Sequence, residues 1–119
     1  MQLATLCYLT RSGRHGPETL FIHRNQRPDD IHYMKHVGLG GRMERGECPF
    51  ECVVREFHEE SGLLIARPEL KGIITFDNTQ RTFGGNPADE DWYVFTYVTG
   101  EFSGDRVISP EEGEVAWVS

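Results

Sequence analysis

The stretch GLGGRMERGECPFECVVREFHEESGLL, residues 38–64, joins a glycine-rich segment to a short predicted helix. Pro49 suits the first turn of a helix, where its missing amide proton costs no hydrogen bond, and Gly62 suits the left-handed position that ends one. We therefore predict a helix over residues 49–61. The preceding VGLGGRMERGE is too rich in glycine for a regular element, so we predict that the chain reaches the helix through an irregular loop.

The predicted helix has two different faces. At about 100° per residue, a face of three glutamates lies roughly 120° away from an apolar stripe. The glutamates are Glu56, Glu59 and Glu60, and the stripe consists of Phe50, Val53, Val54 and Phe57. We expect the stripe, in particular Phe50, Val54 and Phe57, to be buried against a sheet. The glutamates repel one another and face the negative end of the helix dipole, so a bound cation would stabilise them. The alternative is a solvated acidic face.

The loop before the helix favours a bound cation over a solvated acidic face. Hard cations such as Mg²⁺ take oxygen ligands, and a glycine-rich loop can bring a backbone carbonyl close to the ion that the carboxylates bind. Loop and helix together therefore predict a divalent-metal site. Arg55 precedes Glu56 and points a little away from the glutamate face, so we expect it to reach back to Glu47 and fix the junction of loop and helix.

Composition excludes several classes of protein. The 119 residues suit one domain, residues 1–119, and their net charge of -7 argues against binding of a nucleic acid polymer, which needs a clustered basic surface. No apolar run approaches the roughly 20 residues that span a bilayer, so we expect no membrane partner. Cys7, Cys48 and Cys52 lack the spacing of a disulfide framework, and the first residues lack the pattern of a signal peptide. The expected location is a reducing cytoplasm.

Strands are predicted on both sides of the helix. LATLCYLT and TLFIHR, residues 3–10 and 19–24, predict a hairpin across a turn-rich break. LKGIITF, WYVFTYV and EVAWVS predict three later strands because they are rich in β-branched and aromatic residues. The long polar segment over residues 77–91 is either a wall of a binding site or a disordered connection.

The residues around the helix carry a family resemblance. From Gly41 to Leu63 the sequence matches the Nudix box, G-x5-E-x7-R-E-U-x-E-E-x-G-U, where U is an aliphatic or bulky apolar residue. All nine specified positions agree, namely Gly41, Glu47, Arg55, Glu56, Phe57, Glu59, Glu60, Gly62 and Leu63. The chain thus resembles the Nudix hydrolases. The resemblance implies an α+β fold in which a mixed β-sheet is sandwiched between α-helices.

The resemblance also implies a chemistry. Nudix hydrolases cleave a nucleoside diphosphate linked to another group, with Mg²⁺ or Mn²⁺ held by the glutamates of the box. It assigns the metal ligands to Glu56, Glu59, Glu60 and the Gly40 carbonyl, a catalytic role to these glutamates with Arg55, and structural support of the site to Gly41, Glu47 and Gly62. The general base stays open between Glu56 and a later glutamate, because Glu111, Glu112 and Glu114 are alternatives that also suit plain exposed positions.

Other residues outside the box have open roles. Arg24, Lys35 and Arg42 flank the loop and can meet the phosphate oxygens of a substrate, or are solvated surface cations. His32 and His36 have the spacing of a zinc pair only if they are helical, and no HExxH accompanies them. Cys48 and Cys52 have a helical i, i+4 spacing that suits a redox or metal pair, although reduced packing residues are favoured.

The substrate is the least determined feature. The chain is most similar to MutT-like enzymes, which hydrolyse 8-oxo-dGTP and related nucleoside triphosphates to a nucleoside monophosphate and pyrophosphate. Those relatives recognise the base through an amide side chain before the glycine loop and a segment after the last strand. Here Val37 lies near the first position and the chain ends at Ser119, so we expect either a missing C-terminal segment or a broad specificity. The alternatives are ADP-ribose or dinucleoside polyphosphate hydrolysis, a catalytically idle nucleotide-binding Nudix module, and an acidic interaction domain.

Overall fold

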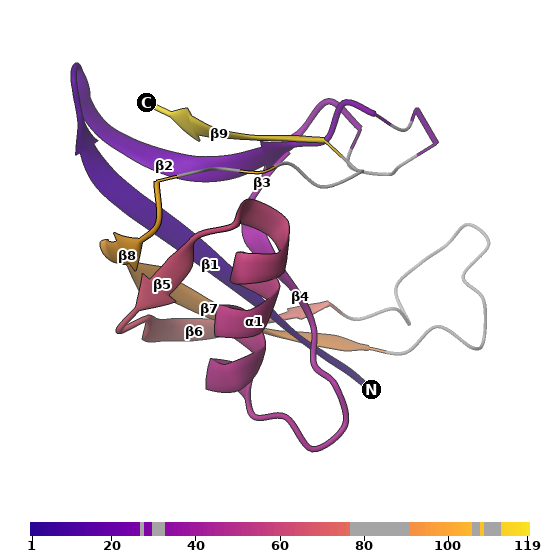
Figure 1. Cartoon of the computed structure of the whole chain (residues 1–119). Coiled ribbons are helices and arrows are strands. Elements are labelled where there is room, and N and C mark those ends of the chain that lie inside the picture. Colours follow the sequence, from indigo (N-terminus) through magenta and orange to yellow (C-terminus); the bar gives the residue numbers. More distant parts are fainter. Residues whose placement is uncertain (27, 30–32, 77–90, 106–107, 109–112) are drawn as a thin grey trace.

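A computed structural model describes residues 1–26, 28–29, 33–76, 91–105, 108 and 113–119. The hairpin predicted at the start of the chain is confirmed, since β1 (Gln2–Gly13) and β2 (Gly16–His23) pair antiparallel up to their connecting turn (Figure 1). Gly16 has a φ of 120° in this turn, a conformation that residues with a side chain rarely adopt.

The long strand β1 is shared between two groups of strands. Its first half pairs parallel with β7 (Trp92–Thr99) and antiparallel with β4 (Leu39–Arg42), and β7 in turn pairs with β6 (Glu69–Phe76). Its second half pairs with β2, which also pairs with β3 (His36–Val37) and β9 (Glu114–Val118). Within the described residues these strands form one mixed sheet of seven strands, and β5 (Leu64–Ala66) and β8 (Glu101–Ser103) form a separate pair.

The sheet confirms the later strand predictions and the α+β class. Among the described residues there is one helix, α1 (Pro49–Ser61), and it packs against β4, β1 and β5. The second helical layer that the resemblance implies has no counterpart in these residues. No helix in the described part of the chain is long and apolar enough to cross a membrane. Nearly all of the polar segment over residues 77–91 lies outside the described residues.

The glycine-rich segment is more regular than predicted. Residues 39–42 form strand β4 and pair with residues 4–7 of β1, so the prediction of an irregular loop was wrong for this part. A Cβ atom at Gly40 would overlap the Thr5 carbonyl group, and one at Gly41 would overlap the Glu56 carboxylate. The glycines therefore allow β4 to lie closely between β1 and α1, and this tertiary contact outweighs the low strand propensity of glycine.

Helix α1 begins and ends where the sequence predicts. The Cys48 amide donates to Glu51 Oε1 over 3.1 Å at its start, and Gly62, with a φ of 80°, ends it by donating to the His58 carbonyl oxygen over 2.8 Å. The residues of its buried face are Cys52, Val53, Phe57 and Ser61. Phe57 is fully buried in the core with Leu9, Leu20 and Ile22 of the hairpin.

The first turn of α1 departs from the prediction. Phe50 is 51% exposed, whereas we expected it to be buried, and Val54 is partly buried. Phe50 has the helical phase of the buried face, but it lies in the first turn of α1, shortly after the exposed segment over residues 44–46. Position along the helix axis, which hydrophobic periodicity does not report, therefore decided its exposure.

Candidate active site

Arg55 and Glu47 form the bidentate pair that the sequence predicts. Arg55 Nε donates to Glu47 Oε2 over 2.6 Å, and Arg55 Nη2 donates to Glu47 Oε1 over 2.9 Å. The same Nη2 also donates to the Arg42 carbonyl oxygen over 3.2 Å. Because a bidentate pair fixes the direction of both side chains, Arg55 ties the segment between β4 and α1 to the second turn of the helix.

Arg55 also belongs to the glutamate cluster, so the expectation that it points away from those glutamates was wrong. Its Nη1 donates to Glu56 Oε1 over 2.8 Å and lies 3.3 Å from Glu59 Oε2 and 3.6 Å from Glu44 Oε1. With Glu47, four carboxylates surround one guanidinium group. The centre of the cluster is therefore cationic and its surroundings carry an excess of negative charge.

The three helix glutamates face different surroundings. Glu56 faces Gly41, because a Cβ atom at Gly41 would overlap the Glu56 carboxylate. Glu60 Oε1 accepts a hydrogen bond of 2.8 Å from the Gly40 amide. The Glu59 side chain is 57% exposed and contacts Arg55. Two of the three glutamates thus face β4, so this is not a purely solvated acidic face.

The pKa values of two carboxylates that contact Arg55 shift in opposite directions. Hydrogen bonds from Arg55 and from the Glu44 backbone lower the pKa of Glu47 to about 2. Burial raises the pKa of Glu56, although the hydrogen bond and the charge of Arg55 act in the other direction. The hydrogen bonds with Glu47 raise the pKa of Arg55, so its guanidinium is charged at neutral pH.

The donor set fits a hard divalent cation. Glu56, Glu59 and Glu60 offer carboxylate oxygens, and the adjoining Gly40 and Gly41 have no side chain to block a backbone carbonyl. In the described residues no three acidic, histidine or cysteine side chains are arranged as the ligands of one metal ion, since Glu56 and Glu59 contact Arg55 and Glu60 contacts the Gly40 amide. The assignment of metal ligands stays a prediction.

A cleft of about 270 Å³ opens beside this cluster. Arg24 and Glu60 are its charged residues, Gly38, Gly40 and Gly41 contribute backbone, and its apolar lining consists of Leu6, Ile22, Val37 and Phe76. Apolar walls with a few polar groups are typical of small-molecule sites. The sequence singled out Arg24 and Val37 in this lining but not Phe76, whose position at the end of a strand before a long segment was the available signal.

The other two basic residues predicted to bind substrate lie elsewhere. Lys35 is exposed, and its carbonyl oxygen accepts a hydrogen bond of 3.0 Å from the Arg24 amide. Arg42 Nη2 donates to Gln2 Oε1 over 2.6 Å, and its guanidinium lies 5.6 Å from the Trp92 ring centre. Neither residue lines the cleft, so of the three cations the structure brings only Arg24 to it.

The remaining predicted residues are distributed over the chain. Glu111, Glu112 and His32 lie outside the described residues, and Glu114 is exposed on β9 opposite His23. His36 lies on β3 with its ring stacked 4.5 Å from that of His23. All three cysteines are free, with Cys48 exposed and Cys52 buried. Glu44 was not predicted, and its only signal was its spacing of three residues from Glu47.

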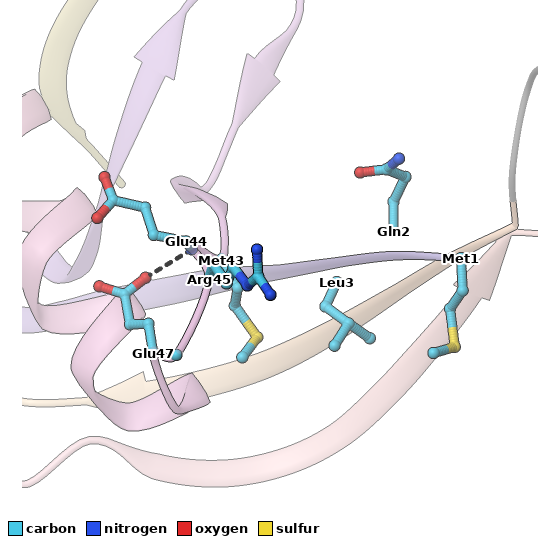
Figure 2. Close-up of a pocket in the computed structure, with 8 residues that line it drawn as sticks. Met1, Gln2, Leu3, Met43, Glu44, Arg45 and Glu47 are labelled. Carbon is cyan, nitrogen blue, oxygen red and sulfur yellow. Dashed lines mark hydrogen bonds between the residues drawn. The ribbon is translucent and has the colours of Figure 1, made fainter.

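A second hollow of about 390 Å³ lies between the start of β1 and the segment that precedes α1, and Glu47 is part of its lining. Figure 2 shows the Glu44 amide donating to the Glu47 carboxylate at one end of it, with Gln2 and Met1 at the other. It is larger than the cleft, but its lining includes neither Glu56, Glu59 and Glu60 nor the β4 glycines. The smaller cleft is therefore the better candidate for a reaction site.

The chain matches the NUDIX domain family over residues 1–119. The uncharacterized Nudix hydrolase YvcI of Bacillus subtilis (strain 168) is 38% identical over 81 residues, which are 68% of this chain and 49% of that protein. This chain thus spans about half the length of that curated relative.

Solved structures share the fold. The MutT protein from Bacillus halodurans has a TM-score of 0.73 at 30% identity, covering 98% of this chain and 67% of that chain. A MutT NUDIX hydrolase from Burkholderia pseudomallei has a TM-score of 0.74 at 24% identity, covering 98% and 81%. An Ap4A hydrolase from C. elegans has a TM-score of 0.70 at 15% identity, covering 98% and 79%. The last two show similarity of fold alone.

Proposed function

The chain belongs to the Nudix hydrolase family, and we propose that it hydrolyses a nucleoside triphosphate, oxidised or unmodified, to a nucleoside monophosphate and pyrophosphate. One observation carries the proposal. Four carboxylates surround the single guanidinium of Arg55, and a fifth, that of Glu60, lies at the edge of the adjacent cleft. Such an excess of negative charge beside a cleft suits a substrate whose phosphates arrive with divalent cations.

The residues that we propose to hold the cation are Glu56, Glu59, Glu60 and the Gly40 carbonyl. A bound Mg²⁺ or Mn²⁺ would neutralise the phosphate charge and make the water bound to it more acidic. Arg55 contributes by keeping Glu56 ionised and oriented, because it donates to one oxygen, Oε1, over 2.8 Å. Glu47 contributes indirectly, since its bidentate pair with Arg55 fixes the direction of the guanidinium.

We propose that Glu56 accepts the proton of the attacking water. A general base works best when its pKa lies near the working pH, and burial raises the pKa of Glu56 above the ordinary value of a glutamate. Arg55 holds Oε1, and Oε2 is the Glu56 atom that faces Gly41 most closely. Of the later glutamates, Glu114 is exposed on β9, and Glu111 and Glu112 lie outside the described residues.

The cleft supports a nucleotide as the substrate. Its apolar residues, Leu6, Ile22, Val37 and Phe76, suit the faces of a nucleobase, and Arg24 suits a phosphate or a base oxygen. Arg24 is therefore proposed as a substrate-binding residue, while Lys35 and Arg42 are proposed only for contacts outside the cleft. The free cysteines agree with the proposed cytoplasmic location.

Product analysis tests the proposal. Nucleoside triphosphates, 8-oxo-dGTP, ADP-ribose and dinucleoside polyphosphates are incubated with the protein and Mg²⁺ or Mn²⁺. We expect the triphosphates to give a monophosphate and pyrophosphate, and Glu56→Gln to abolish this turnover. Glu69→Gln is the matched control, because Glu69 is an exposed glutamate paired with Lys71 on β6. Preferred cleavage of ADP-ribose or of a dinucleoside polyphosphate would contradict the proposed substrate, and binding of nucleotides without turnover would contradict the proposed reaction.

A further inference from the structure

Two buried polar side chains contact the glycine segment at Gly41. Thr5 on β1 is 1% exposed and Cys52 on α1 is fully buried. Thr5 Oγ1 and Cys52 Sγ lie 3.3 Å apart, and each lies 3.5 Å from the Gly41 carbonyl oxygen. The hydroxyl and the thiol carry one proton each, so one of them donates to the carbonyl and the other donates to its neighbour. Either direction satisfies this triangle.

The same segment contacts the proposed catalytic carboxylates. The Gly40 amide donates to Glu60 Oε1 over 2.8 Å, and Gly41 approaches Glu56 so closely that a Cβ atom would overlap its carboxylate. Cys52 Sγ also lies 4.0 Å from Arg55 Nη2. A displacement of the Gly41 carbonyl would therefore move the backbone that faces Glu56 and Glu60.

We propose that Thr5 and Cys52 are positioning residues that set the distance of the Gly40–Gly41 segment from Glu56 and Glu60. The consequence for turnover rests on the proposed function, whereas the placement of the segment does not. Hydrogen bonds to the residues that surround a metal or a reacting group are worth about 10-fold to 100-fold in metal affinity or activity. Thr5 and Cys52 act in this way through Gly41 and touch no substrate.

Cys7 provides a matched contrast. It is fully buried on the same strand as Thr5 and belongs to the hydrophobic core, and among the described residues its thiol has no hydrogen bond. Loss of either buried sulfur leaves a cavity of similar size, so Cys7→Ala controls for packing. Cys7 pairs with Leu39 of β4 through the backbone, but of the two substitutions only Cys52→Ala removes a side-chain hydrogen bond to the Gly41 carbonyl oxygen.

Backbone hydrogen exchange tests the placement directly. We expect the amides of residues 39–42 to exchange about 10-fold faster in Cys52→Ala and in Thr5→Val, because each variant loses one hydrogen bond that holds the segment, and faster still in the double variant. Cys52→Ser and Thr5→Ser keep a donor and should return the exchange to that of the wild type, and Cys7→Ala should leave it unchanged once global stability is taken into account. Unchanged exchange in both Cys52→Ala and Thr5→Val would overturn the proposal.

Kinetics test the consequence. We expect kcat to fall about 10-fold in Cys52→Ala and in Thr5→Val with little change in KM, because the cleft that holds the nucleotide is intact. The serine variants should recover most of the loss. An equal loss of kcat in Cys7→Ala would overturn the proposal by showing a general packing effect. A wild-type protein that turns over no nucleotide would refute the proposed function alone, and the exchange measurement would still decide whether Thr5 and Cys52 hold the segment.

Discussion

Glu47 in the segment before α1 and Glu56 within α1 bind the same guanidinium group, yet their pKa values move in opposite directions. Glu47 binds Arg55 with both oxygens and has a pKa of about 2. Glu56 binds it with one oxygen, and burial raises its pKa. The loop glutamate is thus an anchor whose charge is fully stabilised, whereas the helix glutamate keeps a charge that the fold only partly stabilises. Incomplete compensation is what a residue needs if it is to take up a proton or a cation.

The largest expected effect is a loss of turnover, which distinguishes the helix glutamate Glu60 from the anchor Glu47. Glu60→Gln should lower turnover by about 10²-fold or more, because the amide loses the negative charge proposed to hold the cation. Its stability without metal should stay level or rise by ~0.3 to 1 kcal/mol, since one of several repelling charges near the helix C-terminus is removed. The amide oxygen can still accept the hydrogen bond from the Gly40 amide. Steady-state kinetics and metal-free melting are measured on one preparation.

Glu60→Gln has two outcomes that count against the assignment. A rate close to that of the wild type at saturating Mg²⁺ would show that Glu60 is no ligand. A large loss of metal-free melting temperature would show that its charge stabilises the fold, as the charge of Glu47 does.

Glu47→Gln should mainly lower stability, by a moderate amount, whereas Glu60→Gln should mainly lower turnover. Loss of the charged bidentate partner of Arg55 should lower the free energy of unfolding at neutral pH by about 1 to 2 kcal/mol. The pKa of Glu47 is lowered in the folded state to about 2 from 4.5, so its contribution is complete above about pH 4.5 and is lost as the pH falls toward 2. Urea unfolding of both proteins at several pH values measures this. A stability difference that stayed constant from pH 7 to pH 3 would contradict the anchor role.

The pH dependence of turnover sharpens the role of the helix glutamates. We expect the rate at saturating metal to rise severalfold from neutral to alkaline pH, because the attacking water must lose a proton. Glu47→Gln should lower the rate without changing this slope, since Glu47 does not titrate in that range. A wild-type rate that decreased steadily from pH 6 to pH 9 would exclude a deprotonated nucleophile.

The smallest expected effect concerns the first turn of α1, where the two regions meet. Phe50 is 51% exposed, so Phe50→Ala should change the free energy of unfolding by no more than about 0.5 kcal/mol, as at other surface positions. Thermal melting measures the change. A loss of several kcal/mol, which a buried phenylalanine gives on truncation, would show that Phe50 packs against the core after all.

Several features of the site could be predicted from sequence because they depend on short-range geometry. The limits of α1 follow from Pro49 and Gly62, and both limits are confirmed. The pairing of Arg55 with Glu47 was predicted correctly since the two residues are only 8 positions apart, and most of these positions lie in the first two turns of α1. The irregular loop predicted before α1 was wrong over residues 39–42 because their strand partner, residues 4–7 of β1, is distant in sequence. The direction predicted for Arg55 was wrong because helical phase alone does not show that Glu44 and Glu47 of the preceding segment and Glu56 and Glu59 of α1 converge on its guanidinium.

By itself the sequence determined the family, the limits of helix α1, the strands around it, and the set of carboxylates that carries the proposed chemistry, because each of these depends on residue types at fixed spacings along the chain. Only the tertiary structure decided that Gly40 and Gly41 form a strand between β1 and α1, that Arg24 reaches the cleft while Arg42 turns toward Gln2 and Trp92, and that Thr5 meets Cys52. The physical reason is that strand pairing and close packing bring together residues far apart in the chain, such as Thr5 and Cys52, which are 47 positions apart, and the preference of a single residue for its local conformation contains no information about such a neighbour.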